Sequence, residues 1–202
     1  MKLAVASDCE PLPADLLALL EAAGLPVGPL RGAAGSDGLG DAVEWVVAPG
    51  VDVFTLCRRG GVSAGIVGKE LVLEHGEDLF ELVDLGVVRR RLVYAAPSKV
   101  ARRRRLRLAT RYPRTTRRFF TAVGQQVDTL VMTSPLLGVA TGIADGVVEL
   151  EHLLPQQATE LVIKAPVAEC SARVVAGPQA RALCGHDLQA LVQRLQQARG
   201  GA

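Results

Sequence analysis

Short apolar runs alternate with helical patterns along most of the chain. Residues 2–6 form an apolar run of strand type, and residues 15–23 follow with leucines at helical spacing. Gly24 and Pro26 then mark the end of that helix, because neither residue continues a helix well. A strand followed by a helix is the repeating unit of an α/β protein.

The same alternation continues toward the C-terminus and predicts an α/β fold with a mainly parallel sheet. Residues 43–47 and 52–56 fit either strands or short helices, and residues 78–85 form a capped, mixed segment. A mobile loop and a phosphate cradle both fit the glycine-rich residues 28–40. Further strands are predicted at 63–68, 91–96, 107–110, 161–166 and 172–176, and helices at 69–75, from Thr115 or Thr116 to Val123, and at 186–198.

Residues 129–151 have the clearest local organisation. Residues 129–133 read as a strand, and Ser134 and Pro135 stand where a helix takes its N-cap and its first-turn proline. A compact helix poor in bulky residues should follow, and then a second buried strand at 143–150. Strand, helix and strand in this order predict a parallel βαβ unit.

Polar residues at this unit are candidate ligand groups. Ligands of parallel sheets gather at the carboxyl ends of the strands, where helix N-termini offer N–H groups to anions. Thr133 ends the first strand and Ser134 follows it, and the second strand carries Asp145 and Glu149. Lys69 places an ammonium at the end of another predicted strand. We expect these groups to meet a ligand, while an ordinary βαβ segment with solvated acids is the alternative.

Composition places the chain among soluble globular proteins. Its 202 residues allow one large domain or two small lobes, and 49% hydrophobic residues provide a sizeable core. No apolar run is long enough for a membrane span, and the N-terminus reaches Asp8 too early for a secretory signal, which predicts a cytoplasmic protein. Four scattered cysteines lack the paired spacing of a zinc site, so buried or idle thiols are expected.

Charge is distributed unevenly along the chain despite a net charge of only +2. Residues 1–88 contain 14 of the 21 acids, whereas residues 89–118 contain 13 of the 23 Lys and Arg and no acid. The dense run at 102–105 could bind RNA, a phosphate-rich molecule or an acidic partner, or could form a solvated loop. Since aromatic residues make up only 3%, a base-stacking nucleic-acid surface is not expected. Arg91, beside an apolar strand, should be held in place.

Six collinear strings resemble the short form of the ATP phosphoribosyltransferase family, across nearly the whole chain and at about that family's spacing. The strings are Gly65-Ile-Val-Gly-Lys-Glu70, Asp78-Leu-Phe-Glu-Leu-Val-Asp-Leu-Gly86, Arg91-Leu-Val93, Arg107-Leu-Ala-Thr-Arg-Tyr-Pro113, Gly142-Ile-Ala-Asp-Gly-Val-Val-Glu149 and Ser171-Ala-Arg-Val174.

The resemblance implies a two-lobed fold and a reaction. The fold would be of the periplasmic-binding-protein type II kind, with residues 1–90 and 172–202 in one lobe, 91–171 in the other, and the active site between them. N1 of ATP would displace pyrophosphate from phosphoribosyl pyrophosphate, with Mg²⁺ on the leaving group, in the first step of histidine biosynthesis.

The resemblance also implies roles for residues and a partner. Asp145 and Glu149 would lie at the ribose, with Glu149 where the family usually has Asp, and Lys69, Arg91 and Thr110 match family motif positions. No metal ligand among the protein's residues is implied. The protein would form a homodimer, or a hetero-octamer with a regulatory subunit that resembles histidyl-tRNA synthetase.

This chain departs from the family where phosphate is bound. The family's Thr-Gly-x-Thr loop, whose N–H groups and hydroxyls grip the 5′-phosphate, is replaced by Leu153-Leu-Pro-Gln156. Its Pro-Lys-Gly-Arg becomes Ala6-Ser-Asp-Cys9, its Arg-x-x-Asp-Val-Pro becomes Pro49-Gly-Val-Asp-Val-Phe54, and an acid becomes Ser63. Each lost charge-assisted contact weakens binding by roughly 1.5–3 kcal/mol. A divergent transferase and an inactive relative that serves binding or assembly are both consistent with these changes.

Overall fold

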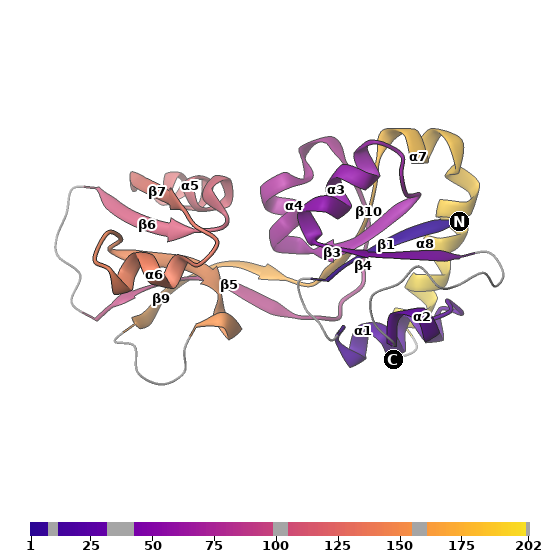
Figure 1. The fold of residues 1–202 in the computed structure, drawn as a ribbon, viewed down its shortest axis with the longest axis horizontal. Helices are drawn as coiled ribbons and strands as arrows, with labels where there is room; N and C mark the ends of the chain where they lie inside the picture. The colour runs from indigo at the N-terminus through magenta and orange to yellow at the C-terminus, as the bar shows by residue number, and fades with distance from the viewer. Residues whose placement is uncertain (8–11, 32–42, 99–104, 155–160, 201–202) are drawn as a thin grey trace. The chain divides into compact units, whose positions relative to one another are not determined.

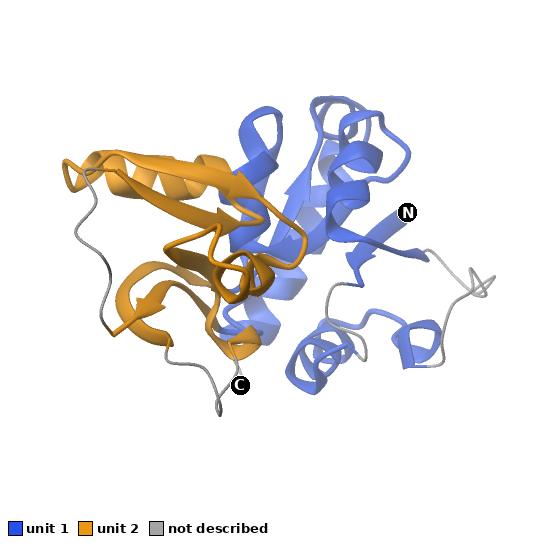
Figure 2. Cartoon of the chain, turned by 60° about the vertical axis from the view of Figure 1, so that its left-hand side comes forward, with its two compact units in different colours: residues 1–89, 171–202 blue, residues 90–170 orange. Residues whose placement is uncertain are grey.

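The fold was analysed in a computed structural model, which describes residues 1–7, 12–31, 43–98, 105–154 and 161–200 (Figure 1). The chain divides into two compact units (Figure 2). Unit 1 contains residues 1–89 and 171–202, and unit 2 contains residues 90–170. The chain therefore passes from one unit to the other twice, after residues 89 and 170.

Unit 1 is built on a five-stranded sheet in the order β2-β1-β3-β10-β4. The pairs β2–β1 and β1–β3 are parallel, whereas β10 runs antiparallel to both of its neighbours. The central strands are continuous apolar runs because both faces of the sheet are covered. The strands are β1 (Lys2–Ala6), β2 (Glu44–Ala48), β3 (Ala64–Gly68), β4 (Phe80–Asp84) and β10 (Ala172–Ala176).

Helices cover both faces of this sheet. The larger core cluster joins one face to α1 and α8, and the smaller cluster joins the other face to α3, as the opposite sides of unit 1 in Figure 1 show. A Cβ at Gly65 would lie 2.4 Å from Val53 Cγ1, so glycine lets α3 pack directly on β3. The helices are α1 (Ala14–Ala22), α2 (Gly28–Arg31), α3 (Gly50–Arg58), α4 (Lys69–His75), η1 (Gly76–Asp78), α7 (Pro178–Leu183) and α8 (Gly185–Gly200).

Unit 2 repeats this plan with the sheet order β7-β6-β8-β5-β9. Strands β7 and β8 both run parallel to β6, which lies between them, and β5 is antiparallel to β8 and β9. The strands are β5 (Arg90–Pro97), β6 (Leu106–Thr110), β7 (Val127–Val131), β8 (Gly146–Leu150) and β9 (Leu161–Cys170), and the helices are α5 (Pro113–Ala122), α6 (Pro135–Ala140) and η2 (Glu151–Leu153).

The two longer helices of unit 2 pack by different means. On α5, Phe120 meets Tyr94 of β5 edge to face, with ring centroids 5.2 Å apart. On α6, small residues permit a close approach, since a Cβ at Gly138 would lie only 2.8 Å from the Cβ of Ala109. The helix poor in bulky residues that the sequence predicts is therefore a tightly seated one.

The structure confirms the α/β class and corrects several local predictions. A mainly parallel sheet is wrong, because β4, β5, β9 and β10 pair antiparallel. Helix α5 begins at Pro113 and not at a threonine cap, since proline fits the first helical position. The mixed segment 78–85 contains strand β4, and 52–56 lies within α3. Of the glycine-rich residues 28–40, the first four form α2, and 32–40 lie outside the described residues.

Candidate active site

Three parallel strands of unit 2 end at one edge of its sheet. Strands β6, β7 and β8 run in the same direction, so the residues that follow them lie together. Arg111 follows β6, Thr133 and Ser134 follow β7, and Glu149 lies near the end of β8. We call these four residues the carboxyl edge of unit 2. It is the place where the fold offers polar side chains to a ligand.

At this edge Glu149 is buried and Arg111 is exposed. Arg111 donates from Nε to Glu149 Oε2 at 3.0 Å and from Nη2 to Oε1 at 2.9 Å, a bidentate pair. The N–H of Leu150 also donates to Glu149 Oε1, at 2.8 Å. The Glu149 side chain is 3% exposed, whereas that of Arg111 is 38% exposed. A ligand that reaches this pair from solvent therefore meets the cation first.

Asp145 makes a similar pair at the opposite end of the same two strands. Its Oδ2 accepts from the Arg107 N–H at 2.9 Å, and its Oδ1 accepts from Arg107 Nη2 at 3.0 Å. Hydrogen bonding to Asp145 raises the pKa of Arg107. Asp145 and Glu149 are four positions apart along the strand, which corresponds to about 13 Å. The structure thus does not bring the two predicted acids together, and Asp145 joins β8 to β6.

The hydroxyl groups at the edge fall into two kinds. Thr110 is fully buried, and its Oγ1 donates to the Val148 carbonyl at 2.8 Å and accepts from the Tyr112 N–H at 2.9 Å. It therefore supports the chain beneath Arg111. Thr133 and Ser134 are exposed, and Ser134 is the N-cap of α6 as predicted, although its side chain makes no capping hydrogen bond. Thr133 and Ser134 can reach a bound molecule without rearrangement.

A second ion pair lies where β5 meets the end of β8. Arg91 is held in place, since its Nε and Nη2 donate to the two carboxylate oxygens of Glu151 at 2.6 Å. The hydrogen bonds from Arg91 lower the pKa of Glu151. In neighbouring His152, partial burial lowers the pKa, and the cations Arg90 and Arg111 lower it further against the opposing effect of Glu149. Positive charge thus dominates around the imidazole.

The segment that the resemblance aligns with a phosphate-binding loop begins directly after these residues. Leu153 is 43% exposed, and Leu154 packs against the small core cluster beneath α6. Pro155 and Gln156 lie outside the described residues. Two aliphatic side chains therefore stand where hydroxyl and glycine N–H groups would be needed to bind a phosphate.

In unit 1, Lys69 stands at the carboxyl end of β3 and begins α4, as predicted. Its Nζ lies 2.5 Å from Glu81 Oε2, and Glu81 also forms an ion pair with Arg173. Arg173 in turn contacts Asp84 at 2.8 Å. Lys69 thus belongs to a charge network that joins the start of α4 to β4 and β10, and its side chain is 24% exposed.

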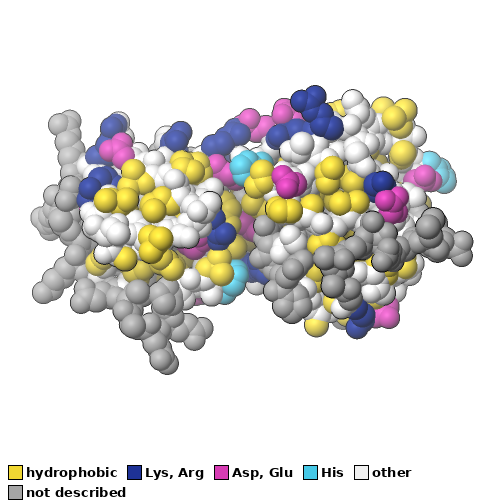
Figure 3. Space-filling model, viewed as in Figure 1, with side chains coloured by type: hydrophobic (Ala, Val, Ile, Leu, Met, Phe, Trp, Pro, Cys, Tyr) yellow, Lys and Arg dark blue, Asp and Glu magenta, His cyan; other side chains and the backbone are white. Residues whose placement is uncertain are grey.

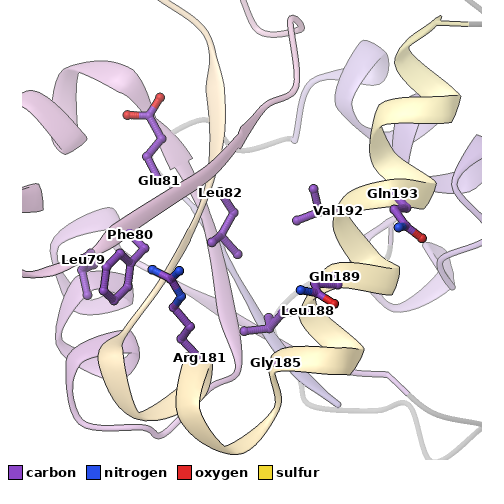
Figure 4. A pocket seen from close by; sticks show the side chains of 10 residues that line it. All are labelled: Leu79, Phe80, Glu81, Leu82, Arg181, Gly185, Leu188, Gln189, Val192 and Gln193. Carbon is purple, nitrogen blue, oxygen red and sulfur yellow. The ribbon is translucent and has the colours of Figure 1, made fainter.

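Unit 1 has a groove between β4 and helices α7 and α8, with a volume of about 850 Å³ (Figure 4). Phe80, Leu82, Leu188 and Val192 provide its apolar surface, and the Arg181 guanidinium lies 4.5 Å from the centre of the Phe80 ring. None of the predicted site residues lines this groove.

The other predictions concern thiols, metals, membranes and the basic run. Cys57 and Cys170 are buried cysteines, as expected, and burial raises the pKa of the Cys57 thiol to about 12. Cys9 lies outside the described residues. The described residues contain no group of three His, Cys, Asp or Glu that could hold a metal ion. No helix in the same ranges is long and apolar enough to cross a membrane. Residues 102–104 are not described; on the face in Figure 3, other Lys and Arg lie scattered among acids.

Sequence reasoning missed Arg107 and Arg111 as partners of the acids. It treated both as part of a general basic segment, although each stands 38 residues before its acid. Because β6 and β8 are parallel neighbours, an equal separation puts both pairs in register. That repeated spacing was the available signal.

Two α/β units, each with a mixed five-stranded sheet and helices on both faces, define a protein of the periplasmic-binding-protein architecture. The sulfonate-binding protein SsuA of Xanthomonas axonopodis has this fold, with a TM-score of 0.57 and 13% identity over 98% of this chain and 72% of its own. The ATP phosphoribosyltransferase (HisG:HisZ) complex of Thermotoga maritima contains a more similar chain, with a TM-score of 0.75 and 19% identity over the whole of both chains.

The sequence comparisons narrow this class to one family. The model of the ATP phosphoribosyltransferases (HisG) matches residues 49–197. The ATP phosphoribosyltransferase of Rubrobacter xylanophilus is 37% identical over 65% of this chain and 67% of its own length, and that of Symbiobacterium thermophilum 34% identical over 76% and 73%. The chain belongs to the ATP phosphoribosyltransferase family, whose reaction is the first step of histidine biosynthesis, as the sequence strings predict.

Proposed function

We propose that this protein transfers a phosphoribosyl group to N1 of ATP, with the carboxyl edge of unit 2 as part of its active site. The single observation that carries this proposal is the gathering of Arg111, Thr133, Ser134 and Glu149 at the ends of three parallel strands, in a chain of this family. Such an edge suits a molecule rich in hydroxyl and phosphate oxygens.

The edge supports binding and orientation of the sugar phosphate. The exposed hydroxyls of Thr133 and Ser134 would donate to phosphate oxygens. Lys69 and Arg91 would steady the negative charge that grows on pyrophosphate as it leaves C1 of the ribose. Mg²⁺ would arrive with phosphoribosyl pyrophosphate and neutralise part of that charge.

A catalytically inactive relative is the second candidate, and the aliphatic loop start favours it. Leu153 and Leu154 offer no polar side chain, and Leu154 is packed against the core of unit 2. Such a protein would keep the fold for binding or assembly and would bind the nucleotide weakly or not at all.

Assembly with a second subunit fits the family. The neighbour of Thermotoga maritima is a HisG:HisZ complex by its name. We propose a partner of that type for this chain, a regulatory subunit that resembles histidyl-tRNA synthetase, in a hetero-octamer, with a homodimer as the simpler form. A biosynthetic role with ATP as substrate favours the cytoplasm.

The test is formation of phosphoribosyl-ATP from ATP, phosphoribosyl pyrophosphate and Mg²⁺, with and without a HisZ-type partner. We expect turnover, and we expect at least about a 10-fold loss in the double variant Thr133→Val, Ser134→Ala, because two hydroxyl donors to phosphate are removed. Thr141→Val is the matched control, since the hydroxyl of Thr141 donates a hydrogen bond to the carbonyl of Leu137 in α6. Absence of product in all conditions would establish the inactive relative instead.

A further inference from the structure

We infer that Arg111 contacts an anionic oxygen of the ligand, and that Glu149 acts through Arg111 as a positioning residue. This inference rests on the proposed function for the identity of the ligand, a phosphoribosyl phosphate. It exchanges the expected roles of the two residues, because the arginine and not the acid contacts the ligand. The family resemblance would put the acid at the sugar, whereas this chain buries the acid and exposes the arginine.

Burial distinguishes the two side chains. Glu149 is 2% exposed as a residue, and its carboxylate accepts two hydrogen bonds from Arg111 and one from the Leu150 N–H. A ribose hydroxyl could reach this carboxylate only after that arrangement was broken. Arg111 keeps 38% of its side chain exposed at the same place. A ligand can therefore meet the exposed part of Arg111 while the bidentate contact to Glu149 stays intact.

The bidentate contact also fixes the guanidinium plane. Glu149 holds Nε and Nη2 at 3.0 and 2.9 Å, so the plane of Arg111 is set by a buried partner and not by solvent. A planar guanidinium fixed from behind suits a phosphate oxygen in front. Thr110, buried beneath, accepts a hydrogen bond from the N–H of Tyr112 and holds the backbone that carries Arg111.

The inference accounts for a chemical deficit of this chain. The loop that begins at Leu153 has lost hydroxyl donors, and a phosphate at the carboxyl edge needs other partners. Arg111 supplies a permanent positive charge at the end of β6. In the sequence β6 precedes β8 by two strands, but in the sheet the two strands are direct neighbours. One charge-assisted contact of this kind corresponds to a factor of about 10 to 100 in affinity.

The test measures binding of phosphoribosyl pyrophosphate with Mg²⁺, and separately of inorganic pyrophosphate, by titration calorimetry on the full chain. We expect Arg111→Gln to weaken binding of both probes by about 10-fold or more. Arg111→Lys, which keeps the charge and the fold but not the bidentate geometry, should lose less. The probe affinity of Glu149→Gln should fall between those of wild type and Arg111→Gln, because the arginine remains but is less well fixed.

Arg107→Gln is the matched control. It breaks the same kind of pair, on the same two strands, at the end that faces away from the carboxyl edge. It should lower stability and leave probe affinity unchanged.

The outcomes separate this inference from the proposed function. If wild type turns over and Arg111→Gln binds both probes as wild type does, the inference is overturned and the function stands. If wild type makes no phosphoribosyl-ATP but binds the probes through Arg111, the inference stands and the function fails. If wild type binds neither probe, the inference is wrong.

Discussion

Arg111 and Glu149 face each other across strands β6 and β8, and their spacing of 38 positions is also that of Arg107 and Asp145. Parallel pairing of these strands puts both arginines in register with both acids. One pair ties the strands together at their amino ends. The other combines a buried carboxylate with an exposed guanidinium at the ends where ligands of such sheets bind.

Loss of either arginine should destabilise unit 2 by different amounts. Arg111→Gln leaves the buried Glu149 carboxylate without its bidentate partner, and we expect a loss of about 2–3 kcal/mol in the free energy of unfolding. In Arg107→Gln the carboxylate left without its partner is that of Asp145, which is 10% exposed against 3% for Glu149, so we expect a smaller loss. Urea unfolding at pH 7 measures both. Equal losses would mean that the burial of Glu149 has no energetic consequence.

Lys69 should matter more for activity than for stability. Its ion pair with Glu81 lies near the surface and contributes under about 1 kcal/mol to folding. If Lys69 steadies the leaving pyrophosphate, Lys69→Met lowers kcat by at least about 10-fold while the urea midpoint hardly moves. Lys2→Met, which breaks the exposed pair with Glu44, is the control and should leave kcat unchanged. Parallel loss of kcat and of stability in Lys69→Met would assign Lys69 a structural role.

Asp84 predicts an acid-dependent loss of stability in unit 1. Burial works to raise the pKa of this carboxyl, but the Ser171 hydroxyl, the Gly86 N–H and the cations Arg173 and Arg199 outweigh it, so the pKa is lowered. The stabilisation is therefore complete above the unfolded pKa of about 3.8 and disappears as pH falls through the folded value.

Asp84→Asn tests this sign. At pH 7 the variant should be about 1–2 kcal/mol less stable than wild type. The difference should shrink below about pH 4. Asp78→Asn is the control, because that carboxylate is 75% exposed and lies 3.6 Å from Arg58. A deficit of Asp84→Asn that persists unchanged at pH 3 would show that the charge of Asp84 is not its source.

His152 should report the charge around the carboxyl edge. Burial first, and then Arg90 and Arg111, lower its pKa below the ordinary histidine value of 6.5. Since the pKa of His152 is lower in the folded than in the unfolded protein, protonation of the imidazole opposes folding. The free energy of unfolding therefore rises with pH between the folded pKa and 6.5, and does not depend on this group above pH 6.5. His152→Asn should therefore gain stability relative to wild type at pH 5 and equal it at pH 8.

The same imidazole can detect an anion beside Arg111. Pyrophosphate bound there would offset part of the arginine's charge, so the pKa of His152 should rise on addition of pyrophosphate, as followed by the NMR titration of its ring protons. In Arg111→Gln the ring should titrate identically with and without pyrophosphate. A rise of equal size in that variant would place the anion elsewhere.

Much of the fold could be predicted because the signal was local. The apolar run at Lys2–Ala6, the lysine that begins α4, and the Ser134-Pro135 helix start each depend on a few adjacent residues, and the structure confirms them. Strand direction could not be predicted in the same way. Nothing in the apolar run at β10 indicates that it pairs antiparallel with β3, since that depends on where the chain returns to unit 1.

The candidate site was predicted only in part, for a related reason. Sequence pattern singled out Glu149, Thr133 and Ser134 as candidates, and the structure locates them at strand and helix ends. It did not show that Glu149 would be buried, because burial depends on Arg111, 38 residues earlier. It also treated Asp145 and Glu149 as one pair, although residues four apart on a strand lie about 13 Å apart. Contacts between distant segments decide the chemistry of this edge.

Amide chemical-shift mapping with phosphoribosyl pyrophosphate and Mg²⁺ tests the central claim most directly. If the carboxyl edge of unit 2 binds the phosphoribosyl group, the N–H signals of Arg111, Thr133, Ser134 and Leu150 should shift together and saturate with one affinity. Leu82 and Gln189, in the groove between β4 and α8, should stay unchanged. Shifts confined to that groove would contradict the account, and so would the absence of shifts at both places.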